Sequence, residues 1–232
     1  MLVVDREPDL VRHQAGDTER FLGVTHTVGR DARGLLGEGG RFLARDAQGG
    51  APEVAFAVRL PHADSPVDLS FSRSNGLLVV EVERAPSEDE TAVRLHQLER
   101  ASSAFERAGS IKQLCEIAAV EFRRLCGFDR VMIYRFLEDG AGVVLAEDKR
   151  EADHSFLNHH FPATDIPKQA RELYVRNLVR CIPAVTYAPA PLIPALAEGA
   201  ALDMSDSVLR SVSPIHLQYM RNMGVGASAS VS

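Results

Sequence analysis

Residues 160–180 read HFPATDIPKQARELYVRNLVR, a run that joins a proline-flanked turn to a helical pattern. Pro167 stands at the start of that pattern, where its missing N–H costs little. We expect the helix to continue to about residue 177. A carboxylate, a tyrosine and several arginines are costly to collect on a purely structural helix, so this stretch predicts a pocket for a large, flat, anionic ligand.

The composition describes a chain that can form a packed core. Of its 232 residues, 45% are hydrophobic and 25% are charged, which suits one large domain or two small ones. A net charge of -6 argues against nucleic acid or an anionic membrane as the main partner. No apolar run approaches the roughly 18 residues that cross a bilayer. The cysteines, Cys115, Cys126 and Cys181, are sparse and odd in number, which favours reduced thiols and a cytoplasmic location.

Residues 1–84 predict a small sheet domain with short helices. Strand-like runs lie at residues 2–4, 54–58 and 77–82, and Ser74-Asn75-Gly76 predicts a hairpin turn. The glycines of residues 29–40 predict a loop-rich region, and they lack the Gly-Lys-Ser/Thr ending of a phosphate loop. A polar linker follows at residues 85–90.

The rest of the chain, residues 91–232, predicts a second domain of mixed helices and strands. Helices are expected at 91–107, 110–125, 207–211 and 213–222, and strands at 129–136, 142–147, 182–187 and 225–232. Ser110 is expected to cap the second of these helices and Gly127 to end it, and Ser213-Pro214 is a natural start for the last. In the last strand, small apolar residues alternate with serines, which predicts one apolar face and one hydroxyl face. The predicted fold class is therefore α/β (α+β).

Two arginines are the first candidates for ligand binding. Arg180 and Arg210 both lie in apolar surroundings, and a guanidinium fork binds a carboxylate with two parallel hydrogen bonds. Each is alternatively an ordinary surface arginine. Asp165 lies between two prolines that fix its backbone, so its carbonyl and carboxylate could accept hydrogen bonds from a ligand. Its alternative is a carboxylate favoured by the dipole at a helix N-terminus.

Other side chains have similar double interpretations. His216 and Tyr219 share a helix face, with Ser213 three residues earlier, and a buried, satisfied histidine is the alternative. Tyr134 lies in an apolar strand where its hydroxyl needs a partner, and a core aromatic is the alternative. His154, His159 and His160 match no standard metal-ligand spacing. Cys181 has no base placed beside it by the local sequence, so we expect no enzymatic activity.

Three ordered segments, at residues 128–136, 161–167 and 208–224, resemble motifs of phytochrome GAF domains. The chain as a whole resembles the PAS–GAF pair of a bacteriophytochrome photosensory module, most strongly from Phe128 onward. The resemblance implies a PAS domain over residues 1–84 without its N-terminal segment, and a GAF domain over residues 91–232 without its last strands. Each is expected to be an antiparallel sheet flanked by helices.

The resemblance implies a linear tetrapyrrole, biliverdin, as the cofactor of a red/far-red light photoreceptor. Asp165 would face pyrrole nitrogens, Arg180 and Arg210 would bind propionates, and His216 would pack near the central rings. Light would isomerise a double bond near the last ring and rearrange the surrounding hydrogen bonds. The full implied binding set is Tyr134, Phe161, Asp165, Ile166, Pro167, Tyr174, Arg180, Arg210, Ser213, Ile215, His216, Tyr219, Ser228 and Ser230.

The chain departs from the family at the attachment site. Ile215 stands before His216, where plant and many cyanobacterial relatives carry the attachment cysteine, and none of the three cysteines matches an attachment position. We therefore expect covalent attachment to be impossible with the residues present, and bilin binding to be noncovalent and weak. The expected partners are the bilin, a second copy through the GAF helices, and PHY and kinase domains outside this chain.

Two other functions remain open. A GAF or PAS module of this kind could sense a small ligand such as a cyclic nucleotide. Binding of such a ligand does not need Arg180 and Arg210. The module could also serve as a non-photosensory interaction scaffold with an empty pocket.

Overall fold

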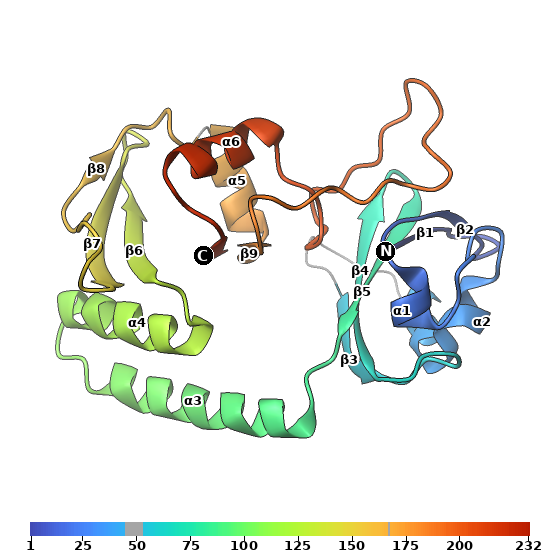
Figure 1. The fold of residues 1–232 in the computed structure, drawn as a ribbon, viewed down its shortest axis with the longest axis horizontal. Coiled ribbons are helices and arrows are strands. Elements are labelled where there is room, and N and C mark those ends of the chain that lie inside the picture. Colours follow the sequence, from blue (N-terminus) through green and yellow to red (C-terminus); the bar gives the residue numbers. More distant parts are fainter. Residues whose placement is uncertain (45–52, 167) are drawn as a thin grey trace. The chain divides into compact units, whose positions relative to one another are not determined.

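A computed structural model describes residues 1–44, 53–166 and 168–232. It contains helices and three antiparallel sheets, which confirms the predicted mixed fold class (Figure 1). The chain divides into two compact units. The first unit joins residues 1–85 to residues 173–232, and the second unit comprises residues 86–172.

The first unit contains a five-stranded antiparallel sheet in the order β2-β1-β5-β4-β3. Its strands are β1 (Leu2–Asp5), β2 (Val11–Gln14), β3 (Glu53–Val58), β4 (Val67–Ser74) and β5 (Leu77–Arg84). The strands predicted at residues 2–4, 54–58 and 77–82 are confirmed. The sequence does not predict β4, because its serines and arginine resemble a polar loop more than a buried strand.

The predicted hairpin turn joins β4 to β5. Ser74 pairs with Leu77, so Asn75 and Gly76 form a two-residue loop. Their φ values of 47° and 85° are both left-handed, which is the conformation that two-residue hairpins require. The Asn-Gly pair adopts it at low cost, and the hairpin fixes the register of β4 and β5.

Short helices pack on the sheet of the first unit. They are α1 (Thr18–Leu22), α2 (Ala32–Leu36) and the 3-10 helix η1 (Gly37–Ala44). The expectation of a loop-rich region at residues 29–40 is partly wrong, because Asp31 caps α2 by accepting from Arg33 and Gly34 N–H groups. The apolar faces meet in one core whose members include Leu2, Val4, Leu22, Leu36, Leu69, Phe71 and Val80.

The second unit contains two helices and a three-stranded sheet in the order β6-β7-β8. The elements are α3 (Glu88–Glu106), α4 (Ile111–Cys126), β6 (Arg130–Phe136), β7 (Gly142–Lys149) and β8 (His160–Phe161). Helix α3 begins inside the predicted linker, because Ser87 and Glu90 form a capping box. Ser110 caps α4 as predicted, and left-handed Gly127 ends it.

The remaining elements follow β8 along the chain. They are α5 (Lys168–Arg176), β9 (Val179–Ile182), α6 (Pro214–Asn222) and β10 (Ser228–Val231), and the division between the units falls within α5. Ser213 and Pro214 start α6 as predicted. Strands β9 and β10 pair antiparallel, but each differs from its predicted range: β9 ends at Ile182 instead of beginning there, and β10 begins only at Ser228.

The predicted helix at residues 207–211 is wrong. The N–H groups of Val208 and Leu209 donate to the Glu81 carboxylate of β5 instead of to carbonyls of their own segment. A tertiary contact thus replaces the local hydrogen bonds that a helix needs.

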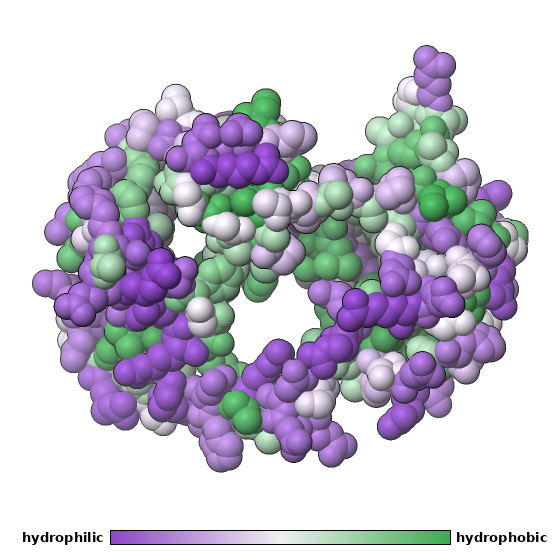
Figure 2. Space-filling view, viewed as in Figure 1, coloured by the Kyte–Doolittle hydropathy of each residue, from purple (hydrophilic) through white to green (hydrophobic). Residues whose placement is uncertain are grey.

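None of the helices in the described residues is long and apolar enough to cross a membrane. Figure 2 shows mainly hydrophilic residues along the visible face of α3, interrupted by a small hydrophobic patch.

Candidate functional site

Arg180 on β9 has the features of an anion-binding residue. Its guanidinium carbon lies 3.6 Å from the centre of the Tyr174 ring, which places the group over an aromatic face. Its Nε and Nη2 atoms are buried, and they have no hydrogen-bond partner within the described residues. Buried donors normally have acceptors. Arg180 therefore has two unpaired donors of the kind that bind a carboxylate, and it is more than an ordinary surface arginine.

The surroundings of Arg180 lower the pKa of its guanidinium. Burial lowers the pKa of the Arg180 guanidinium, Tyr174 raises it, and the Arg210 charge lowers it again. The influence of Arg210 shows that the two predicted arginines share one electrostatic environment within the first unit. Two neighbouring cations repel each other, and an anionic ligand would relieve that repulsion.

The hydroxyl face predicted for the last strand lies on the same side as Arg180. Ser230 pairs directly with Arg180, and Ser228 pairs with Ile182. Cross-strand partners share a face of the sheet, so both serines lie on the Arg180 side. Ser228 and Ser230 are half-buried, whereas Ala229 and Val231 are exposed. The polar face, not the apolar face, is thus the covered one.

Arg210 lies in a turn between β9 and α6. Its Nη1 atom donates to the Ser207 carbonyl oxygen at 2.6 Å, which leaves the remaining donors of its fork for a ligand. The side chain is half-buried.

Helix α6 has one buried face and one exposed face. Leu217 and Met220 pack in a cluster with Ile182 and Val185. His216 and Tyr219 lie away from that cluster, with ring centres 6.4 Å apart and planes inclined by 20°. His216 is exposed, so the alternative of a buried, satisfied histidine is wrong.

Two further predicted residues sit at the start of α6. Ser213 caps the helix by accepting from the Ile215 N–H at 3.3 Å, and Ile215 itself is 82% exposed. Ser213 thus has a structural role whether or not it meets a ligand.

Tyr134 belongs to an aromatic cluster in the second unit. Its ring centre lies 5.3 Å from that of Phe136 and 6.0 Å from that of Phe161. Tyr134 and Phe161 are half-buried. The structure therefore brings two predicted aromatic residues together, as a partly open cluster on β6 and β8 instead of a closed core.

The Asp165 turn is fixed by a residue that the sequence interpretation did not single out. Arg171 donates through Nη1 to the carbonyl oxygens of Ile166 at 2.6 Å, Ala163 at 3.2 Å and Gly140 at 3.3 Å. Asp165 is exposed, and its N–H donates to the Pro162 carbonyl at 3.1 Å. In the sequence, an arginine five residues after Ile166 is the feature that could have identified this contact.

Pro167 lies outside the described residues, and Ile166 is half-buried. The predicted binding residues are therefore placed in two sets, one in each unit. The first unit holds Tyr174, Arg180, Arg210, Ser213, Ile215, His216, Tyr219, Ser228 and Ser230, and the second holds Tyr134, Phe161, Asp165 and Ile166.

Gly142→Ala should displace the Tyr134 ring. A Cβ atom at Gly142 would lie 1.8 Å from the Tyr134 hydroxyl oxygen, so the ring must move. We expect the free energy of unfolding to fall by about 1–3 kcal/mol, as for other overpacked sites. Urea unfolding measures this change. The control is Gly226→Ala, whose Cβ would meet no atom within 4 Å, and equal stability of the two variants would contradict the placement of Tyr134.

The comparisons with known proteins identify the family. The family described as the GAF domain matches residues 110–232. The chain aligns with the crystal structure of the chromophore-binding domain of the Stigmatella aurantiaca bacteriophytochrome at a TM-score of 0.83 and 35% identity, covering 100% of this chain and 79% of that one. The chain belongs to the phytochrome family. The predicted bacteriophytochrome resemblance is confirmed.

Curated phytochromes are similar over shorter stretches. Cyanobacterial phytochrome B of Nostoc sp. is 42% identical over 184 residues, which cover 77% of this chain and 24% of that protein. The bacteriophytochrome of Pseudomonas aeruginosa is 53% identical over 114 residues, which cover 48% of this chain and 16% of that protein. The chain thus spans a quarter or less of these phytochromes. The predicted domain boundaries at residues 84 and 91 stay a prediction.

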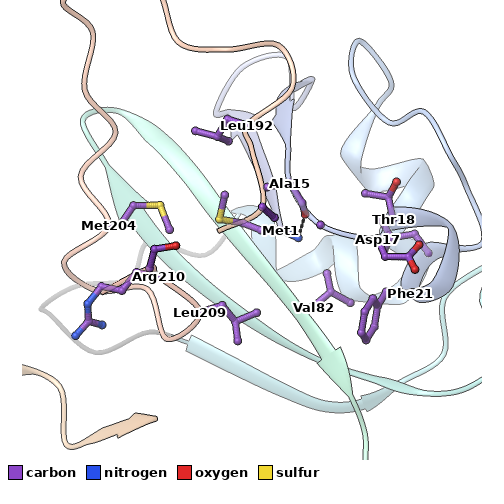
Figure 3. A pocket seen from close by; sticks show the side chains of 14 residues that line it. Met1, Ala15, Asp17, Thr18, Phe21, Val82, Leu192, Met204, Leu209 and Arg210 are labelled. Atoms are coloured by element: carbon purple, nitrogen blue, oxygen red, sulfur yellow. Dashed lines mark hydrogen bonds between the residues drawn. The ribbon is translucent and has the colours of Figure 1, made fainter. Parts of the chain in front are cut away.

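A separate cavity of about 440 Å³ lies in the first unit (Figure 3). Its lining is mainly apolar and includes Phe21, Val82, Leu192 and Leu209. Of the predicted binding residues, only Arg210 lines it. The cavity therefore does not coincide with the Arg180 face of β9 and β10.

Metal binding and cysteine chemistry are the remaining alternatives. Within the described residues, no group of three or more His, Cys, Asp or Glu side chains is placed to hold a metal ion. Partial desolvation, followed by the Glu83 carboxylate, raises the pKa of the Cys181 thiol. A cysteine nucleophile needs the opposite shift, so Cys181 is poorly suited to catalysis.

Proposed function

We propose that this phytochrome chain binds biliverdin and is the pigment-binding part of a red/far-red light photoreceptor. The observation that carries the proposal is the Arg180 guanidinium, which lies over the Tyr174 ring and has two buried, unpaired donors. A linear tetrapyrrole carries two propionate carboxylates, and this donor set fits a carboxylate. Membership of the phytochrome family supports the same ligand class.

The chain's residues supply distinct functions in this proposal. Arg180 and Arg210 bind the two carboxylates, and Ser230, beside Arg180, adds a hydroxyl to the same face. The stacked His216 and Tyr219 rings offer an aromatic surface to the conjugated system. The proposed ligand, when bound, absorbs red light and isomerises at a double bond.

The family resemblance also implies roles for residues of the second unit. Asp165 accepts from pyrrole N–H groups, and Arg171 keeps its turn in place. Tyr134 and Phe161 pack against the ring that rotates. These assignments to Asp165, Tyr134 and Phe161 are proposals for the residues that the family resemblance implies.

We further propose that binding is noncovalent, because none of the three cysteines matches an attachment position. The cysteines form no disulfide, and Cys126 and Cys181 are exposed. The test is incubation of the chain with biliverdin, followed by a denaturing gel and zinc-induced fluorescence. We expect no fluorescent band, while native gel filtration shows pigment eluting with the protein. A fluorescent band would refute noncovalent binding, and pigment-free protein in gel filtration would refute the proposed ligand.

A cyclic nucleotide sensor is the second candidate, since GAF domains as a class admit small ligands. Charge reversal at Arg180 and Arg210 distinguishes biliverdin binding from cyclic nucleotide binding, because a cyclic nucleotide sensor does not need the two arginines. Biliverdin binding should be lost in Arg180→Glu/Arg210→Glu, whereas nucleotide binding, if present, should persist. The homodimer, the cytoplasmic location, the absence of enzymatic activity and the external PHY and kinase domains stay predictions.

A further inference from the structure

Glu81 is a buried carboxylate whose partners lie far away in the sequence. It stands on the central strand β5 and is 0% exposed. Its Oε2 accepts from the Val208 N–H at 2.8 Å, and its Oε1 accepts from the Leu209 N–H at 2.6 Å. Burial raises the pKa of Glu81, while the two N–H groups and nearby positive charges lower it. One carboxylate thus satisfies two consecutive backbone donors of an irregular segment.

The same segment has three other attachments within the first unit. The Ser207 hydroxyl lies 3.4 Å from the Ser72 hydroxyl of β4, and both are buried. Asn177, just after α5, donates to the Ser205 carbonyl at 2.7 Å. Arg176 forms an ion pair with Asp206. We call residues 205–210 the anchored turn. Its one local backbone hydrogen bond among the described residues runs from the Ser207 N–H to the Met204 carbonyl at 3.0 Å. The contacts with Glu81, Ser72, Asn177 and Arg176 join it to the rest of the first unit.

Arg210 is the last residue of the anchored turn. Its own guanidinium donates back to the Ser207 carbonyl, so its direction depends on where residues 207–209 lie. Figure 3 shows the Leu209 side chain turned toward Val82 and Phe21 in the cavity, and the Arg210 guanidinium turned away from those two residues. Glu81 holds the two residues that immediately precede Arg210, and it is therefore one residue removed from a proposed ligand contact.

We propose that Glu81 is a positioning residue that fixes the Arg210 guanidinium for one carboxylate of the ligand. This inference rests on the proposed function. Glu81 does not touch the ligand itself. It aligns the turn in advance, so that Arg210 does not have to be ordered when the anion binds.

The test compares biliverdin with biliverdin dimethyl ester, which has the same conjugated rings and no free carboxylates. Glu81→Gln keeps one acceptor but places an amide donor against a backbone N–H, which should release the turn. We expect Glu81→Gln to weaken biliverdin binding about tenfold and to change ester binding less than about twofold. In an Arg210→Gln background, Glu81→Gln should add less than about twofold to the loss.

The matched control is Glu83→Gln, an exposed glutamate two residues along the same strand, which should leave both affinities unchanged. Equal weakening of biliverdin and ester by Glu81→Gln would show a merely structural role and overturn the inference, as would no weakening of either. If the unaltered chain binds neither pigment, the proposed function itself fails, and that result differs from every outcome in which the chain binds.

A second measurement needs no change at Glu81, in case that variant does not fold. Amide hydrogen exchange in the unaltered chain should be slow at Val208 and Leu209, although neither residue lies in a helix or strand. Exchange there as fast as at exposed loop residues such as Ala201 would overturn the inference.

Discussion

Replacing Arg180 and Arg210 together by glutamine is expected to weaken biliverdin binding by about 100-fold or more. A hydrogen bond to a charged group contributes about 1.5–3 kcal/mol, and every 1.4 kcal/mol is about a factor of ten in affinity. Two such contacts therefore account for at least two orders of magnitude. The loss should be larger for Arg180, because its Nε and Nη2 donors are buried and unpaired, whereas Arg210 is already bonded to Ser207.

The measurement is a titration of pigment absorbance against protein for each variant. The control variant is Arg59→Gln/Arg94→Gln, which removes the same charge from two exposed arginines and should change affinity less than about threefold. If the control weakens binding as much as the Arg180 and Arg210 variant, the effect comes from net charge, and the assignment of the two carboxylate contacts is wrong.

Phe71→Ala is expected to lower the free energy of unfolding by about 3–5 kcal/mol, the range for a phenylalanine removed from a packed core. Phe71 is 2% exposed on β4, and its ring stacks on Phe42 with centres 5.6 Å apart. Since residues 173–232 belong to the same compact unit, the loss should also reduce pigment binding at temperatures where the unaltered chain still binds.

Denaturant unfolding followed by circular dichroism measures the change in stability. The matched control is Phe56→Ala on neighbouring β3, where the side chain is 75% exposed and the expected change is within about 0.5 kcal/mol. Similar losses in the two variants would show that Phe71 does not belong to the core of the sheet.

Sequence predictions that depend on neighbouring residues are confirmed, whereas one that is decided by a distant residue is wrong. Ser110, Gly127 and Pro214 act within one helical turn, and their predicted roles in starting or ending helices are confirmed. A helix is predicted at residues 207–211, yet the N–H groups of Val208 and Leu209 donate to Glu81, which precedes Val208 by 127 positions. A local sequence pattern cannot reveal an acceptor that lies so far away in the chain.

In the candidate site, too, the sequence predicts local features and misses those that join distant residues. The alternation of serines in the last strand correctly predicts that Ser228 and Ser230 share a face. It cannot show that this face also carries Arg180, because the pairing of β9 with β10 joins residues about 50 positions apart. The sequence also suggests Arg180 as an anion-binding residue without indicating that Tyr174 supports its guanidinium.

The visible absorption spectrum of the chain after incubation with biliverdin tests the central claim most directly. We predict a structured absorption band in the red that grows with protein concentration and is lost in Arg180→Gln/Arg210→Gln. A spectrum that remains that of free biliverdin at every protein concentration would contradict the account.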